Sequence, residues 1–288
     1  MAFAQNFHIG AGDVVQTSYI ARTLKEKLYI KPGVTVNANI SIPSAEYVLY
    51  WKKGQAASDS GDRIGADGNT VATKPGARQQ FAEKGLERVI VGVDKSYGLS
   101  GVIPGVNIAT VSADQVNAFV VDDTIKAAQT INRDFIKALQ AKATADTAKA
   151  EGLPTFDAND VYESILQLAA KYKEINAGSY MEPTALFVKP TVYAKLVKNN
   201  LIYFKDNSPV SVFPFEVIEC PDSEMTSNMI LMNSVAMING VAFDAAKTMD
   251  ASVMGYANGV AYIGEICYVN KEAELGPDEA DLKLVLAV

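Results

Sequence analysis

Side chains that commonly carry out catalysis are scarce in this sequence. It has one histidine, His8, and two cysteines, Cys220 and Cys267. A Ser–His–Asp or Cys–His arrangement needs a histidine beside its nucleophile, and nothing places His8 near one. A single histidine also excludes metal sites built from several histidines. We interpret His8 as a surface residue and the cysteines as ordinary buried or half-buried thiols.

Two groups of carboxylates could suggest chemistry. The segment "SDSGDRIGADGN" holds Asp59, Asp62 and Asp67, but the spacing is not that of an EF-hand and no glutamate stands at the twelfth position. The segment "DAND" holds Asp157 and Asp160, which suit the start of a helix because carboxylates there complement the helix dipole. The glycine-rich nucleotide-binding motifs and the GxSxG elbow are absent from the sequence. We therefore predict no enzyme activity, no cofactor and no metal.

Composition indicates a globular protein. The 288 residues are 49% hydrophobic and 20% charged, and the net charge of −7 speaks against a general affinity for nucleic-acid phosphate or anionic membranes. The cysteines lack CxxC spacing, which suits a reducing cytoplasm. The sequence starts without the features of a signal peptide. Two long uncharged stretches, Ser96–Ala113 and Met225–Phe243, are interrupted by glycine, asparagine and serine, so neither is expected to cross a membrane.

The strongest secondary-structure prediction is a helix over residues 113–148. Ser112 is the candidate N-cap, and no glycine or proline occurs between Ala113 and Ala150. About thirty residues span about 45 Å in a helix, which is long for a globular protein. The predicted buried stripe consists of Val121, Ile125, Ala128, Ile131, Phe135 and Leu139.

An α/β unit of about 60 residues is predicted to follow. Its first helix has Asp157 as candidate N-cap, "TALFV" is a buried strand, and Pro190 opens a second helix. The buried face of the first helix is predicted to be Val161, Ile165, Leu168, Tyr172 and Ile175. Further strands are predicted at "VSVFPFEVIEC", "NMILMNSVAMI", "GVAYIGEICYVN" and "DLKLVLAV".

A long polar segment separates two predicted strands, Tyr50–Lys53 and Leu86–Val93. Ordering about thirty residues costs roughly 30–60 kcal/mol of backbone entropy. Burying its three large apolar side chains, Ile64, Val71 and Phe81, returns only about 5–9 kcal/mol. We therefore predict that neighbouring chains order this segment.

The order of these elements resembles the major capsid proteins of tailed bacteriophages, which share the Hong Kong 97-type capsid fold. The run "ALFVKPTVYAKL" is the nearest thing to a family signature. The resemblance implies an α+β fold with an N-terminal arm, an extended E-loop, a long spine helix and an axial α/β domain. The implied ranges are 1–45 for the arm, 46–93 for the E-loop, 94–156 for the peripheral domain with the spine helix, 157–244 for the axial domain and 245–288 for a return through the axial sheet to the peripheral domain.

The resemblance also implies a function. Many copies would assemble as hexamers and pentamers into an icosahedral head enclosing double-stranded DNA, without sequence specificity and without a membrane. The protein would be made in the host cytoplasm and reside in the virion, with a scaffolding protein, a portal and decoration proteins as further candidate partners. The candidate inter-subunit contact residues are Trp51, Arg63, Ile64, Lys74, Arg78 and Phe81 in or beside the E-loop, and Tyr203 and Phe204 in "YFKDNSPVSVFP", the candidate contact at the capsomer centre.

Two alternatives stay open. An encapsulin-like nanocompartment shares the fold and encloses cargo enzymes instead of DNA, and nothing in the sequence separates the two. A tail-tube protein would be almost entirely β, and the long helix predicted at 113–148 speaks against it.

Overall fold

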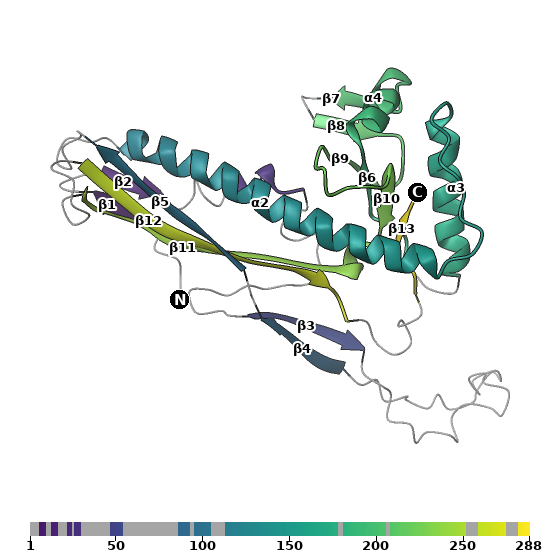
Figure 1. Cartoon of the computed structure of the whole chain (residues 1–288), viewed down its shortest axis with the longest axis horizontal. Coiled ribbons are helices and arrows are strands. Elements are labelled where there is room, and N and C mark those ends of the chain that lie inside the picture. The colour runs from purple at the N-terminus through teal and green to yellow at the C-terminus, as the bar shows by residue number, and fades with distance from the viewer. Residues whose placement is uncertain are drawn as a thin grey trace, which may run out of the picture.

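A long helix, an extended sheet and a more compact α/β unit make up the structure, a computed structural model shown in Figure 1. It describes residues 6–9, 13–16, 22–24, 26–29, 47–53, 86–92, 95–104, 113–177, 181–205, 208–251, 259–274 and 282–288. The long helix runs beside the extended sheet, and the α/β unit stands at the C-terminal half of the helix (Figure 1).

The long helix, α2, spans Ala113–Ala148 and confirms the prediction. Its buried line is correct from Ala128 to Leu139 but wrong further toward the N-terminus, where Val121 and Ile125 are only half-buried. The buried positions there include Val120 and Thr124, because the stripe lies one residue earlier on the helix than predicted. Ser112 lies outside the described residues.

The extended sheet is antiparallel, with strand order β11-β12-β5. Strand β11 spans Met237–Asp250, β12 spans Gly259–Glu272 and β5 spans Lys95–Pro104. Side chains from β5 and β12 form a core with the first half of α2: Leu99, Val260, Tyr262, Ile266 and Tyr268 against Val116, Val120, Ala127, Ala128 and Ile131.

Strand β5 was not predicted, because its glycines obscure the strand pattern. Gly101 pairs with Tyr262 on β12, and a Cβ atom at residue 101 would lie 2.5 Å from the tyrosine ring. Only glycine therefore lets the ring lie across the neighbouring strand.

Two tyrosine hydroxyls tie this sheet to α2. Tyr262 donates to a carboxylate oxygen of Asp123 at 2.5 Å, and Tyr268 donates to Asp134 at 2.7 Å. Lys95 also binds Asp134, at 2.8 Å. Burial alone would raise the pKa of Asp134, but the hydrogen bonds from Lys95 and Tyr268 outweigh it and hold that pKa below its usual value.

The α/β unit, called here the four-stranded unit, has strand order β13-β10-β6-β9. Only the β6–β9 pair is parallel among these neighbours. The strands are Val285–Ala287, Met229–Met232, Ala185–Val188 and Glu216–Glu219 in that order. The unit also includes helices α3 (Val161–Ile175) and α4 (Pro190–Lys198) and residues 201–205 and 208–215, which contain a separate hairpin whose Ile202 belongs to the same core.

The second half of α2 belongs to the core of this unit. Phe135, Ile136 and Leu139 are buried there, and the ring centroid of Phe135 lies 5.9 Å from that of Phe187 in β6. Helix α2 thus contributes to two hydrophobic cores, one on each half of its length.

Predictions at the helix starts have mixed outcomes. Pro190 opens α4, as predicted. The N-cap of α3 is Asp160 and not Asp157, since Asp160 accepts from the backbone N–H of Glu163 at 3.0 Å. Asp157 instead accepts from the N–H of Asn159 at 2.8 Å, which forms a turn just before the helix.

The predicted strand "GVAYIGEICYVN" is confirmed as β12, which continues to Glu272. The remaining predicted strands are correct in place but shorter or divided. "VSVFPFEVIEC" divides into β8 (Ser208–Ser211) and β9, with a bend around Pro214. "NMILMNSVAMI" divides into β10, a short 3₁₀ helix η1 (Ser234–Ala236) and the start of β11. "DLKLVLAV" provides only the three residues of β13.

The predicted strands that enclose the polar segment are confirmed. Strands β3 (Tyr47–Lys53) and β4 (Leu86–Gly92) pair in antiparallel fashion. The segment between them, residues 54–85, lies outside the described residues. A further pair, β1 (Asn6–Ile9) with β2 (Asp13–Gln16), was not predicted, and His8 lies in β1.

Candidate inter-subunit surface

Exposed apolar side chains mark the candidate functional surface. Within the described ranges, the large apolar residues that remain exposed are Phe119, Tyr162, Leu166, Tyr203, Phe204, Val212 and Ile263. All but Phe119 and Ile263 belong to the four-stranded unit. Such clustering is typical of a binding surface, because isolated exposed apolar residues are scattered over ordinary proteins.

The first part of this surface is the hairpin of β7 (Ile202–Lys205) and β8. Ile202 is buried and anchors the base of the hairpin. Tyr203 and Phe204 are 49% and 61% exposed, so both aromatic side chains face solvent in the single chain. We call Tyr203 and Phe204 the aromatic tip.

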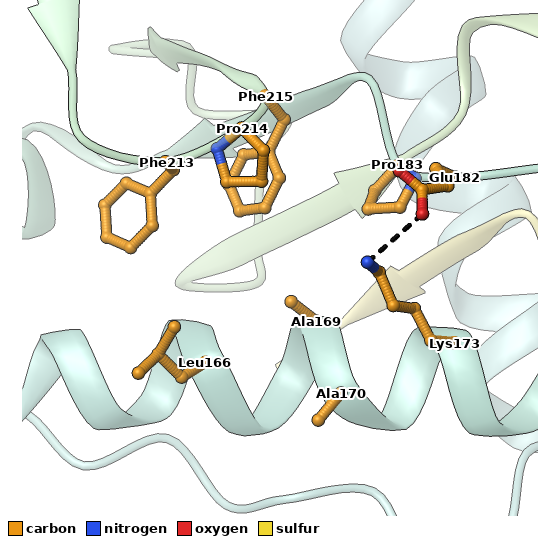
Figure 2. Close-up of a pocket in the computed structure, with 9 residues that line it drawn as sticks. All are labelled: Leu166, Ala169, Ala170, Lys173, Glu182, Pro183, Phe213, Pro214 and Phe215. Atoms are coloured by element: carbon orange, nitrogen blue, oxygen red, sulfur yellow. Dashed lines mark hydrogen bonds and ion pairs between the residues drawn. The ribbon is translucent and has the colours of Figure 1, made fainter.

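The second part is a groove between α3 and residues 213–215. The groove has a volume of about 230 Å³. In Figure 2, Leu166 and Ala169 point from α3 toward Phe213, Pro214 and Phe215 on the facing segment, whereas Ala170 lies on the lower side of the helix. An ion pair between Lys173 and Glu182, at 3.2 Å, lies toward one end (Figure 2).

The wall opposite α3 is held by ring stacking and by one serine. The rings of Phe213 and Phe215 stack with centroids 5.5 Å apart, and Tyr162 of α3 lies 5.9 Å from Phe213. The hydroxyl of Ser211 lies within hydrogen-bond distance of the carbonyl oxygens of Phe213 and Phe215, at 3.3 and 3.2 Å. Because the alanines are small, a hollow remains between this wall and the helix.

The two parts of the surface differ in charge. Residues 151–163, which lead into α3, contain Glu151, Asp157, Asp160 and Glu163 and no lysine or arginine. Residues 185–211, which include α4 and the hairpin, contain Lys189, Lys195, Lys198 and Lys205 and one acidic residue, Asp206, which lies outside the described residues. The segment that leads into α3 is therefore acidic and the hairpin side basic, while the groove lining itself holds one lysine, Lys173, paired with Glu182.

Catalytic and metal chemistry gain no support from the described part of the chain. Those residues hold no cluster of three or more histidine, cysteine or acidic side chains fit for a metal. Cys220 is buried, and burial raises the pKa of its thiol, which disfavours a reactive thiolate. Among the same residues, no helix is both long and apolar enough to span a bilayer.

Comparison with known proteins finds relatives by structure but none by sequence. No family model and no curated protein matches the sequence. Solved structures do match. A chain in the capsid structure of the cyanophage P-SCSP1u has a TM-score of 0.50 at 12% identity, over 88% of this chain and 85% of that one.

Two mycobacteriophage structures agree with this match. For Mycobacterium phage Cain the TM-score is 0.50 at 14% identity, over 89% of this chain and 88% of that one. For Mycobacterium phage Che8 it is 0.50 at 10% identity, over 84% and 83%. This chain has the capsid fold of tailed phages. The predicted class, a mixture of helices and strands in a capsid fold of the Hong Kong 97 type, is confirmed.

The structure describes only three of the eight predicted contact residues. Tyr203 and Phe204 lie together on the exposed hairpin. Trp51 lies in β3, where its backbone pairs with that of Arg88. Arg63, Ile64, Lys74, Arg78 and Phe81 lie outside the described residues.

The groove was not predicted. One signal in the sequence could have revealed it, since Tyr162 and Leu166 are four residues apart on α3 and off its buried stripe. The facing wall could not be foreseen, because 210–220 was predicted as one continuous strand. The bend around Pro214 that interrupts it brings Phe213 and Phe215 opposite the helix.

Proposed function

We propose that this chain is the major capsid protein of a tailed bacteriophage, a structural subunit that assembles into the hexamers and pentamers of an icosahedral head around double-stranded DNA. The single observation that carries the proposal is the fold, which is shared with the cyanophage capsid chain over most of both chains. The exposed apolar surface of the four-stranded unit supports it, because a subunit of a closed shell needs contact area on its sides.

Within this proposal, the implied domains correspond to particular elements. Helix α2 acts as the spine helix of a peripheral domain at 94–156, and the four-stranded unit supplies most of the axial domain at 157–244. The β3–β4 pair supplies the base of the E-loop at 46–93. Residues 1–45 act as the arm, and 245–288 carry the chain through β12 to β13.

The proposed role is mechanical. Each subunit contributes surfaces that its neighbours cover. The head forms because many such contacts between subunits are made cooperatively. An acidic chain, at −7 overall, suits a lumen through which packaged DNA slides without being gripped. Copies of the same chain are the main partner, with a scaffold, a portal and decoration proteins as further partners.

The deciding experiment is electron microscopy of the purified full chain, expressed alone and then with a candidate scaffolding protein. We expect closed shells of one or a few sizes. Their contents distinguish the proposed head, which contains DNA in infected cells, from an encapsulin-like compartment, which contains enzyme cargo. Absence of shells under both conditions would overturn the proposal.

A further inference from the structure

The aromatic tip and the groove are a projecting and a receding apolar surface on the same unit. The tip exposes two large rings, and the groove is lined mainly by Leu166, Ala169, Phe213 and Phe215. Neither is covered by the rest of the described chain. A subunit that exposes both has the two unlike surfaces that a head-to-tail contact requires.

The position of the two surfaces agrees with such a contact. In Figure 1 the β7–β8 hairpin and α4 lie at the top of the four-stranded unit and α3 runs down its right-hand side, so the hairpin and α3 are on opposite sides of α4. A surface on one side of a subunit meets the other side of its neighbour when copies are arranged around a rotation axis. A two-fold contact would instead bring the same surface of both copies together.

Charge favours the same pairing. Lys198 and Lys205 are exposed on the hairpin side, whereas Glu163 is exposed on α3 beside the groove. Placing the hairpin of one copy on the α3 side of another brings these opposite charges together, whereas hairpin against hairpin brings lysines together. Charge complementarity of this kind selects the partner surface and its orientation.

We propose that the aromatic tip of each subunit docks in the α3 groove of the next copy around a ring. Phe204 is the residue that enters the groove, and Lys205 lies near Glu163 of that neighbour. The inference rests on the proposed shell function and adds to it the two surfaces that join adjacent subunits near the capsomer centre.

The first test is disulfide cross-linking in shells assembled from the full chain. The variant Phe204→Cys/Ala169→Cys is oxidised and run on a non-reducing gel, because Ala169 points into the groove. We expect a ladder of covalent multimers that ends at a whole ring, because every subunit supplies one cysteine to each neighbour. Wild type, each single variant and Phe119→Cys/Ala169→Cys are the controls, and we expect none of them to form the ladder.

The outcomes separate this proposal from the shell function. Shells that give no ladder would overturn the docking and leave the proposed function standing. Covalent dimers from Phe204→Cys alone would also overturn it, since they show tip meeting tip. If wild type forms no shells, the proposed function fails and the docking fails with it.

A charge exchange keeps the test decisive if cysteines disturb assembly. We expect Lys205→Glu to lower the yield of shells at least tenfold and Lys205→Glu/Glu163→Lys to restore it to within about twofold of wild type. Circular dichroism of each variant checks that the subunit is folded. Folded double variants that assemble no better than Lys205→Glu would overturn the proposed pairing.

Discussion

The two halves of helix α2 are held in different ways. The first half packs on the three-stranded sheet, where the hydroxyl of Tyr262 reaches Asp123, and the hydroxyl of Tyr268 reaches Asp134 just past the middle of the helix. The second half is part of the apolar core of the four-stranded unit, against side chains such as Phe187. Directional polar bonds near an edge open more readily than a large apolar core. One continuous helix therefore joins a firmly packed region to a more adjustable one.

The largest expected effect comes from the firmly packed half. Phe187 is fully buried and its ring contacts those of Phe135 and Tyr29. We expect Phe187→Ala to lower the free energy of unfolding by about 3–5 kcal/mol, because it leaves a cavity that close packing does not refill. Urea unfolding of the unassembled subunit, followed by circular dichroism, measures it.

The matched variant in the other half is Leu99→Ala, since Leu99 is also fully buried but in the three-stranded sheet. We expect Leu99→Ala to lower the free energy of unfolding by about 2–3 kcal/mol, near the lower end for such truncations. A larger loss for Leu99→Ala than for Phe187→Ala would contradict the comparison.

A smaller and more local effect is expected at the tyrosine bonds. Tyr262→Phe removes the donor to Asp123 and leaves its carboxylate without that partner, at a cost of about 1–3 kcal/mol. Hydrogen exchange should quicken at backbone amides near residues 120–127 and stay unchanged near 139–146.

Gly101 provides a second way to break the same bond. Gly101→Ala forces the Tyr262 ring away from its place, because the new Cβ atom would lie 2.5 Å from it. We therefore expect Tyr262→Phe to cost little more in the Gly101→Ala background, which a double-mutant cycle measures. Fully additive losses would show that the glycine and the hydroxyl act independently.

The smallest expected effect depends on pH. Asp134 has a lowered pKa in the folded chain, so it adds stability above the unfolded value of about 3.9 and loses that contribution as pH falls through the folded pKa. We expect Asp134→Asn to be slightly less stable than wild type at pH 7 and the difference to shrink below about pH 4. Urea midpoints from pH 7 to 3 measure it, with Asp122→Asn, at a largely exposed carboxylate, as control. A difference that does not change with pH would point to packing instead of ionisation.

Local patterns foretold the elements that are governed by local physics. Helix α2 followed from a long stretch without glycine or proline, the start of α4 from Pro190, and β6 from a short apolar run. The α3 cap was wrong by three residues because Asp157 and Asp160 both suit that role, and only the helix start itself selects Asp160.

Features that depend on distant residues were missed. Gly101 reads as a strand breaker until Tyr262, on another strand, lies across it. Of the candidate surface, the sequence indicated Tyr203 and Phe204, whose apolar character stands out in a polar loop. It did not indicate the groove, which exists only once α3 and residues 213–215 have been brought together by the fold.

Strand β13 is synthesised long after the helices whose hydrogen bonds it completes. The backbone N–H of Val285 donates to Asp146 near the end of α2, 139 residues earlier in the chain. Asn176, just after α3, exchanges hydrogen bonds with the backbone of Lys283 at 2.9 and 3.0 Å. At roughly 5–20 residues per second, a ribosome needs about 7–28 s to travel from Asp146 to its partner. Until β13 has been made, Asp146 on α2 and Asn176 after α3 lack these hydrogen bonds, so the side of the four-stranded unit that β13 completes is finished after its other strands.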